Sequence, residues 1–235
     1  MRALDLFSGA GGATKGLQEA GFVVTGVDNQ PQPRYCGDRF VLDDAMAWLR
    51  GEREPLESFD LVWASPPCQL YSELTPMTHK GSHPDLLPEC TRLMREQSVP
   101  YIIENVECAR HLLRSPVRLC GSMFGLGVWR HRYFEVGNSS AFFLTPPCNH
   151  SEQPVVVSGR GMRKTADGHR WSGSRTAESA AAMDIAWMTR LELRQAIPPA
   201  YSRFLASQIL AAQRCKPRET LRARGGEASG VCEGA

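Results

Sequence analysis

The sequence has no apolar stretch that approaches 18 residues, the length a helix needs to span a membrane. It also lacks a long apolar segment near its N-terminus, where Met1-Arg-Ala-Leu-Asp5 leads directly into strand-like sequence. A secretory signal peptide requires such a segment. The two absences argue against a membrane protein and predict one that works in the cytoplasm.

The sequence also has no Cys-x-x-Cys pair, although it contains 8 cysteines in 235 residues. Their scattered spacing indicates neither a zinc site nor a disulfide framework, and we therefore expect no metal. Most of these thiols are expected to pack as small buried hydrophobic groups. Cys68 differs from the others, because two prolines precede it at the end of an expected strand.

Lysine is scarce, since 23 of the 27 basic residues are Arg. Charge is also distributed unevenly along the chain. Residues 1–109 hold 9 basic and 16 acidic residues, a net charge of −7, whereas residues 110–235 hold 18 and 9, a net charge of +9. The basic half predicts contact with a polyanion such as a nucleic acid. An unevenly charged, solvated surface is the alternative.

Strand-like and helix-like segments alternate over the first 135 residues. The expected strands are residues 3–7, 22–27, 59–64, 100–104 and 131–136. The expected helices are residues 14–20, 43–50 and 84–97. Short apolar strands separated by helices predict an α/β fold with a doubly wound, mostly parallel sheet, and residues 131–136 read as an edge strand.

Residues 137–182 interrupt this pattern and are rich in Gly, Ser and Arg, with Val155-Val-Val157 as their only strong strand signal. We interpret them as a small insert in a domain formed by residues 1–136 and 183–215. Pro198-Pro199 then predicts the start of a helix with one apolar face. Residues 216–235 are polar and Gly-rich, and we expect a flexible tail.

A Gly-rich turn follows the first expected strand, in the segment Asp5-Leu-Phe-Ser-Gly-Ala-Gly-Gly12. Such a turn lets a nucleotide-like ligand approach bare backbone and the start of a helix. Thr14 stands where the dinucleotide fingerprint requires Gly or Ala, which argues against NAD. Asp28 ends the next strand, where acidic residues commonly bind ribose hydroxyls. Asp44 could reach an adenine amino group or simply cap a helix.

Chemically reactive side chains follow two later strands. Ser65-Pro-Pro-Cys68 comes after one buried strand, and Glu104 ends the next, so both should lie at the carboxyl edge of the sheet. A thiol beside a carboxyl suits attack on an electron-poor ring whose nitrogen is protonated. The alternative is that Cys68 only packs and Glu104 caps a helix. Arg130 and Arg132 alternate, which predicts two cations on one face of a strand.

These motifs together resemble the DNA (cytosine-5) methyltransferases, and the match covers most of residues 2–213. The similar segments are the Gly-rich turn, Pro66-Pro67-Cys68-Gln69, Glu104-Asn105-Val106, Arg130-x-Arg132 and Gln195-Ala-Ile-Pro-Pro199. The chain departs from the family pattern in four places, one of which is the fusion of the last two family motifs within Trp187–Pro199. Asp28 stands where Glu is more usual, Val128 replaces a Gln, and the target-recognition region, residues 137–182, is short.

The resemblance implies the fold of the S-adenosylmethionine-dependent methyltransferases and methyl transfer to C5 of cytosine in double-stranded DNA. Cys68 would attack C6 of a flipped-out base, Glu104 would hold N3, Arg132 the cytosine carbonyl and Arg130 a phosphate. The residues that it implies for the cofactor, S-adenosylmethionine, are Asp5, Phe7, Ser8, Gly9, Gly11, Gly12, Asp28, Asn29, Asp44, Pro66, Gln195 and Ala196. Residues 70–83 would close over the DNA as a mobile loop, or form an ordinary surface loop.

Arginines of the insert, among them Arg160, Arg170 and Arg175, are interleaved with Gly and predict contact with a nucleic-acid backbone. Two rival functions remain open at this point. One is methylation of cytosine in RNA on the same fold. The other is a catalytically silent module that binds the cofactor or DNA.

Overall fold

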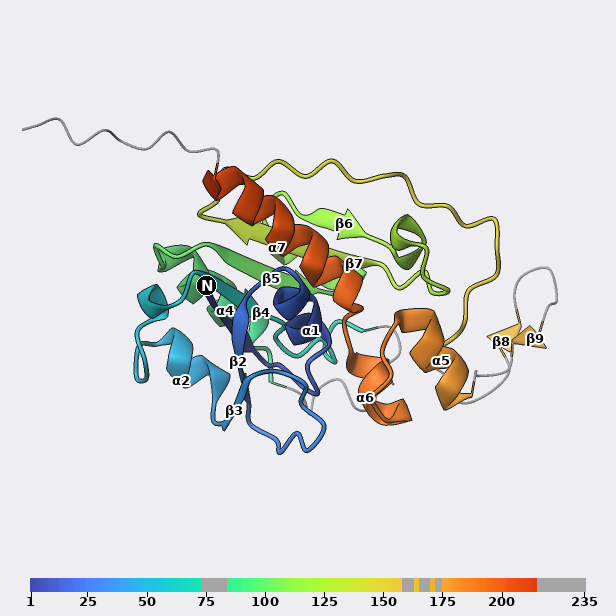
Figure 1. Cartoon of the computed structure of the whole chain (residues 1–235), viewed down its shortest axis with the longest axis horizontal. Coiled ribbons are helices and arrows are strands. Elements are labelled where there is room, and N and C mark those ends of the chain that lie inside the picture. Colours follow the sequence, from blue (N-terminus) through green and yellow to red (C-terminus); the bar gives the residue numbers. More distant parts are fainter. Residues whose placement is uncertain (73–83, 158–162, 165–169, 172–174, 215–235) are drawn as a thin grey trace, which may run out of the picture.

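The computed structural model of the chain describes residues 1–72, 84–157, 163–164, 170–171 and 175–214. For residues 163–164 and 170–171 the description is limited to the backbone. A seven-stranded sheet forms the centre of the molecule, with the strand order β3-β2-β1-β4-β5-β7-β6 (Figure 1). Its strands are β1 (Arg2–Leu6), β2 (Val23–Asp28), β3 (Arg39–Leu42), β4 (Leu61–Ala64), β5 (Tyr101–Asn105), β6 (Val117–Leu119) and β7 (Arg132–Gly137).

The first five strands of the sheet, β3 to β5, run parallel, whereas β7 is antiparallel to both β5 and β6. β4 and β5 are fully buried, as expected for parallel strands covered on both faces. The sequence-based prediction of an α/β fold with a doubly wound, mostly parallel sheet is therefore confirmed. The carboxyl ends of β1, β2, β4 and β5 consequently share one edge of the sheet.

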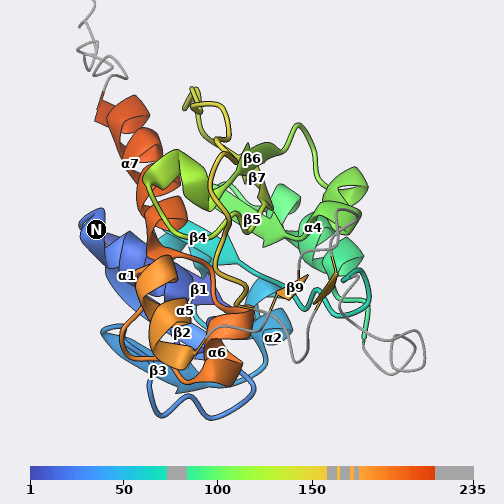
Figure 2. The same ribbon diagram turned by 90° about the vertical axis from the view of Figure 1, so that its right-hand side faces the viewer.

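Helices cover both faces of the sheet (Figure 2). In the described part of the chain the α-helices are α1 (Gly12–Glu19), α2 (Ala45–Leu49), α4 (Leu87–Glu96), α5 (Thr176–Met183), α6 (Arg190–Gln195) and α7 (Pro199–Arg214). Short 3-10 turns lie at Leu56–Ser58, Glu107–Leu112 and Gly121–Phe124. α1 and α7 pack together on one face, and α2 and α4 pack on the other. No helix in the described part of the chain combines the length and apolar character needed to cross a membrane.

Two strands of the sheet differ from the sequence-based prediction. β7 is not an edge strand, because β6 pairs with its outer side. β6 and β3 were not expected, since β6 is only three residues long and β3 is half exposed with no buried residue. Neither segment has the apolar run that made the central strands recognisable.

The predicted insert begins with a long irregular segment that runs from the end of β7 to residue 157. Val155-Val-Val157 does not form a strand, contrary to the prediction. Instead the Val155 amide donates to the carbonyl of Gly127 over 2.7 Å, and Val157 is buried in a small core with Met183 and Ile185. The apolar character of these valines therefore reflects packing against the main domain. Whether residues 137–182 act as a separate recognition unit stays a prediction.

Further along the same stretch lie a two-stranded ribbon, β8 (Arg163–Lys164) with β9 (Arg170–Trp171), and helix α5. The predicted tail, residues 216–235, lies outside the described residues.

A buried carboxylate joins the antiparallel strand to its neighbours. The Glu135 side chain on β7 is 2% exposed and accepts two hydrogen bonds from Arg95 of α4, at 2.8 and 2.7 Å. The Tyr101 hydroxyl and the Arg114 amide donate to the same carboxylate, at 3.0 and 2.7 Å. Burial alone would raise the pKa of Glu135, but these donors outweigh it and hold the pKa below its usual value.

Glu135→Gln should lower the free energy of unfolding by about 2–4 kcal/mol at neutral pH, because Arg95 would lose its buried partner. The advantage of the wild type should be complete above the usual carboxyl pKa of about 4.3 and vanish as the pH falls through the lowered pKa of Glu135. Urea unfolding of both proteins over a pH series measures this. Glu96→Gln, which breaks an exposed pair with Arg92, is the control and should cost less than about 0.5 kcal/mol. Equal losses in both variants would contradict the assigned role.

Candidate functional site

The Gly-rich turn between β1 and α1 adopts a left-handed backbone at Phe7 (φ 60°), Gly9 (φ 50°) and Gly11 (φ 88°). Asp28, at the end of β2, accepts a hydrogen bond from the Gly9 amide at 2.9 Å and another from the Gln30 amide at 2.9 Å. A Cβ atom added to Gly9 would meet no atom within 4 Å. The turn therefore presents the bare backbone of Gly9 to open space.

The other glycines of the turn serve close packing. A Cβ atom on Gly12 would lie 2.5 Å from the carbonyl oxygen of Ile197, in the segment that joins α6 to α7. The Trp187 indole donates to the carbonyl of Ala10 at 2.8 Å. The C-terminal part of the chain thus presses against the turn and brings Gln195 and Ala196 beside it.

Asp5 supports the turn from inside the protein. It is buried at the end of β1 and accepts a hydrogen bond from the Thr14 hydroxyl, while its other oxygen, Oδ1, is buried with no hydrogen-bond partner among the described residues. Burial raises the pKa of Asp5 to about 7, although the hydrogen bonds with Thr14 oppose the shift. Asp44 caps α2 by accepting from the Met46 amide at 2.9 Å, so the capping interpretation holds for one of its oxygens.

A large cleft of about 860 Å³ opens above the turn, along the carboxyl edge of the sheet. Among the residues that the resemblance assigns to the cofactor, all except Gly11 line this cleft: Asp5, Phe7, Ser8, Gly9, Gly12, Asp28, Asn29, Asp44, Pro66, Gln195 and Ala196. Cys68, Glu104 and Arg132 line its far end. The residues predicted to bind the cofactor and those predicted to react with the base therefore line one cleft.

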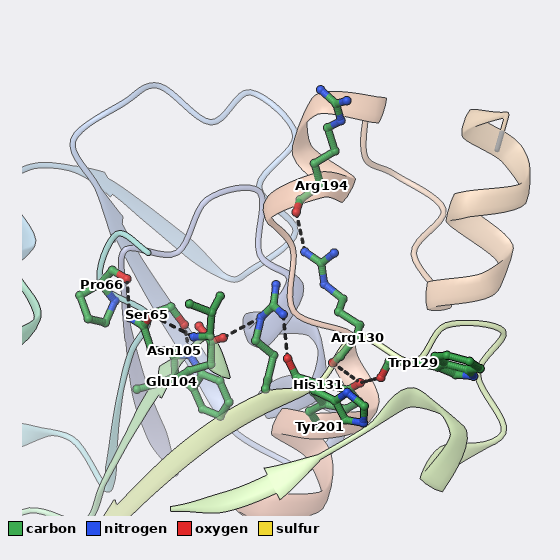
Figure 3. Close-up of polar contacts among 12 residues, drawn as sticks. Ser65, Pro66, Glu104, Asn105, Trp129, Arg130, His131, Arg194 and Tyr201 are labelled. Carbon is green, nitrogen blue, oxygen red and sulfur yellow. Dashed lines mark hydrogen bonds and ion pairs between the residues drawn. The ribbon is translucent and has the colours of Figure 1, made fainter. Parts of the chain in front are cut away.

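Cys68 lies four residues beyond β4, and Glu104 lies on the adjacent parallel strand β5. Asn105 connects the two strand ends, because its Nδ2 donates to the carbonyl of Pro66 at 3.1 Å and its Oδ1 accepts from the Val106 amide at 2.9 Å (Figure 3). This bridge fixes the proline segment, and with it Cys68, against the end of β5.

The carboxylate of Glu104 is 7% exposed and lies 3.0 Å from Nε of Arg132, the first residue of β7. It also hydrogen-bonds with Ser65. Burial raises the pKa of Glu104 above its usual value, although Arg132 and Arg130 act in the opposite direction. Glu104 is therefore a carboxyl group that takes up a proton more readily than an exposed glutamate would.

The thiol of Cys68 is only partly buried, but its environment still favours the protonated form. Burial raises its pKa, and the negative charge of Glu104 adds to the shift. Arg132 and Arg130 oppose both effects. The two arginines are thus the groups that stabilise a thiolate at this position.

Arg130 and Arg132 do not lie on one face of a strand, and this prediction is wrong. β7 begins at Arg132, and Arg130 precedes it with a left-handed backbone (φ 31°). The Arg130 guanidinium reaches toward α6 and donates to the carbonyl of Arg194 at 2.6 Å, as Figure 3 shows. The Tyr201 hydroxyl of α7 donates to the carbonyl of Arg130 at 2.9 Å. Burial, reinforced by Arg132, lowers the pKa of Arg130 to about 9.

A small pocket of about 360 Å³ adjoins the large cleft at Cys68. Its walls come from Val106–Cys108 beyond β5, Val128–Arg132 at the start of β7, and Pro154–Val157 of the insert. Cys68, Ser72, Arg132 and Arg194 line both hollows. The thiol therefore stands where a ligand in the large cleft and a ligand in the small pocket would meet.

Sequence reasoning missed several residues that build this site. Ser65 accepts from the Trp63 indole at 2.8 Å and contacts Glu104, while Arg194, Trp187 and Tyr201 support the turn and Arg130. Ser65 could have been included, because it directly precedes the proline pair at the strand end. The others belong to the C-terminal segment, and only three-dimensional contact reveals them.

Some expectations fall outside the described residues. Of the predicted mobile loop, residues 73–83 lie there, as does Arg160. Arg170 belongs to β9, for which only the backbone is described, whereas Arg175 is exposed at the N-terminus of α5. The expected nucleic-acid contacts of these arginines therefore stay predictions.

Comparison with known proteins identifies relatives for about half of the chain. The family model described as C-5 cytosine-specific DNA methylase matches residues 1–115. The Type II methylase M.HgiDII of Herpetosiphon aurantiacus is 33% identical over 125 residues, 48% of this chain and 35% of that protein. A Frog virus 3 protein named "Probable DNA (cytosine-5)-methyltransferase" is 31% identical over 126 residues, 47% of this chain and 56% of that protein. The matches thus span between one third and little more than half of these relatives.

Solved structures with a similar arrangement include the Dnmt2 methyltransferase of S. pombe, with a TM-score of 0.41 and 20% identity. That similarity covers 61% of this chain and 51% of the other. A DNMT2 mutant of Spodoptera frugiperda has a TM-score of 0.45 and 17% identity, over 67% and 58% of the two chains.

The charges around Cys68 predict how its ionisation responds to mutation. Glu104→Gln removes a negative charge and should shift the pH profile of Cys68 alkylation to lower pH, whereas Arg132→Met should shift it to higher pH. Mass spectrometry of the Cys68 peptide after timed iodoacetamide treatment gives both profiles. The exposed thiol of Cys108 in the same samples is the internal reference. Profiles that move together, or not at all, would refute this electrostatic description.

Proposed function

We propose that the chain is a DNA (cytosine-5) methyltransferase, which transfers a methyl group from S-adenosylmethionine to C5 of cytosine in DNA, as its similarity to such proteins over about half of its length suggests. The observation that carries this proposal is the position of Cys68. Its thiol stands between the cleft of the Gly-rich turn and the small pocket, with the Glu104 carboxyl and the Arg132 guanidinium beside it. One group for each requirement of the reaction is present: a nucleophile, a proton donor and a cation.

The large cleft suits S-adenosylmethionine. The open space above Gly9 lets a ligand reach bare backbone, and Phe7 offers an aromatic side chain for the adenine. Asp28 lies at the end of β2, where acidic residues commonly bind ribose hydroxyls, and Asp44 lines the same cleft. When bound, S-adenosylmethionine supplies an electrophilic methyl group on its sulfonium sulfur.

The chemistry of this chain begins with addition of the Cys68 sulfur to C6 of a cytosine that has been flipped out of the duplex. Glu104, protonated more readily because it is buried, donates its proton to N3 as the C6–S bond forms. The electron pair gained by the ring makes C5 nucleophilic enough to accept a methyl group. C5 then loses its proton to solvent, the C6–S bond breaks to release the thiolate of Cys68, and N3 returns its proton to the Glu104 carboxylate.

Arg130 and Arg132 contribute to this reaction in different ways. Arg132 holds Glu104 in place and would contact the carbonyl oxygen of the base. Both arginines favour the thiolate of Cys68 by their charge. Arg130 would meet a DNA phosphate only after its guanidinium leaves the Arg194 carbonyl, so its proposed role requires a local rearrangement. The insert supplies the outer wall of the small pocket, which supports a role in binding the target strand.

Cys68→Ala should abolish methyl transfer to duplex DNA and covalent trapping by DNA that contains 5-fluorocytosine. Glu104→Gln keeps the side-chain shape and should lower the rate by roughly 10²–10⁴-fold, the usual contribution of general acid–base catalysis. Cys90→Ala, which removes a buried thiol of α4 away from both hollows, is the matched control and should stay active. Transfer of radiolabelled methyl groups measures all three proteins, with tRNA as a parallel substrate. Turnover by Cys68→Ala would refute the mechanism, and a preference for tRNA would refute DNA as the substrate.

S-adenosylmethionine should bind and stabilise the protein, by about 2.7 kcal/mol at a concentration 100-fold above its dissociation constant, whereas NAD should do neither. Gly9→Val should weaken this binding, because its side chain would extend into the cleft. Gly51→Val is the matched control, since Gly51 also has a left-handed backbone (φ 76°) and open space but lies outside the cleft. Calorimetry that finds equal affinity in the two variants would contradict the cofactor position.

A further inference from the structure

Four potential metal ligands meet next to the segment that carries Arg130 and Arg132. Cys120 follows β6, His131 directly precedes β7, and Cys148 and His150 belong to the irregular segment after β7. One ligand atom from each residue lies within 4.8 Å of all the others. Among the described residues this is the one group of three or more His, Cys, Asp or Glu that could hold a metal ion.

Two sulfur–nitrogen distances within this cluster are close to those of a tetrahedral centre. Sγ of Cys120 lies 3.3 Å from Nε2 of His150, and Sγ of Cys148 lies 3.5 Å from Nε2 of His131. Sulfur and nitrogen ligands at the usual zinc distances stand about 3.6 Å apart on a tetrahedron. Two thiolates and two imidazoles are a donor set that zinc prefers.

We propose that Cys120, His131, Cys148 and His150 bind one zinc ion in a closed structural site. The inference is independent of methyl transfer and runs against the sequence-based expectation of no metal. That expectation rested on the absence of Cys-x-x-Cys pairs. Here 10 residues lie between Cys120 and His131, and 16 lie between His131 and Cys148. The fold, not local spacing, brings the ligands together.

Neighbouring side chains complete a second layer around the cluster. The hydroxyl of Ser122 lies 3.2 Å from Sγ of Cys120 and accepts the amide of Asn149 at 3.1 Å. Arg118 donates to Sγ of Cys148 at 3.7 Å. The indole of Trp129 stacks on the His150 ring, with centroids 4.1 Å apart and planes 16° from parallel. Such outer contacts orient metal ligands and favour thiolates.

A zinc ion here would hold the irregular segment against the sheet. Residues 138–157 form no helix or strand, yet Pro154–Val157 line the small pocket next to Cys68. Two metal bonds, from Cys148 and His150, would constrain this segment in the absence of a helix or strand. His131 would be fixed by the same ion, one residue from Arg132.

The test uses the full chain, purified without a polyhistidine tag, and measures its zinc content by mass spectrometry. We expect one zinc ion per chain and a thermal midpoint that falls on chelation and returns with added zinc. Cobalt(II) added to the chelated protein should give the visible absorption of a tetrahedral centre with thiolate ligands. None of these measurements depends on methyl transfer, so failure of the zinc site and failure of the proposed function are distinguishable.

Single substitutions distinguish zinc held by these four ligands from zinc bound nonspecifically elsewhere on the protein. Cys148→Ala and His150→Ala should each lose the zinc ion and lower the thermal midpoint, and the exposed position of His150 keeps its variant soluble enough to measure. Cys108→Ser and His111→Gln, an exposed cysteine and histidine outside the cluster, should retain zinc. Chelated protein that takes up neither zinc nor cobalt, equal zinc loss in the controls, or a disulfide between Cys120 and Cys148 in freshly purified protein would each overturn the proposal.

Discussion

The contact between Glu104 and Arg132 depends on one topological constraint, the reversal of strand direction between β5 and β7. A parallel strand ends at the carboxyl edge of the sheet, whereas an antiparallel neighbour begins there. The last residues of β5 therefore face the first residue of β7, and Cys68 arrives at the same edge from β4. A fully parallel sheet would have placed Arg132 at the opposite edge, far from both groups.

This arrangement places the charged side chains of Glu104, Arg130 and Arg132 where little water reaches them. Neighbouring residues hold these charged groups in position. Arg130 lies in a left-handed conformation that costs free energy, and the hydroxyl of Tyr201 and the carbonyl of Arg194 hold it there. Burial, reinforced by repulsion from the neighbouring Arg132, lowers the pKa of Arg130 to about 9. An anion that entered the small pocket would relieve this repulsion, which is a physical reason for a polyanion to bind at that point.

The central sheet and the pairing of Cys68 with Glu104 were predictable from the sequence, because buried parallel strands have strong apolar runs and their ends share one edge. The geometry of the arginines was not predictable. Alternation in the sequence implies one face only within a strand, and the strand begins at Arg132. Val155-Val-Val157 misled for a related reason, since burial against the domain produces the same apolar run as a strand does.

The cysteine and histidine cluster was hidden for a different reason. Local spacing reveals a metal site when its ligands lie close together in the sequence, but these ligands come from one end of the β6–β7 pair and from the segment after β7. The register of that pair nevertheless explains their convergence. Leu119 and Arg132 are the last pair of the β6–β7 ladder. Cys120 and His131 are the next residues on the two strands, and they therefore lie opposite each other. The contacts of these two neighbours diverge, because Nε2 of His131 meets Sγ of Cys148 whereas Nε of Arg132 meets the Glu104 carboxylate. The start of a single strand thus supplies a cation to the cleft on one side and a ligand to the metal cluster on the other.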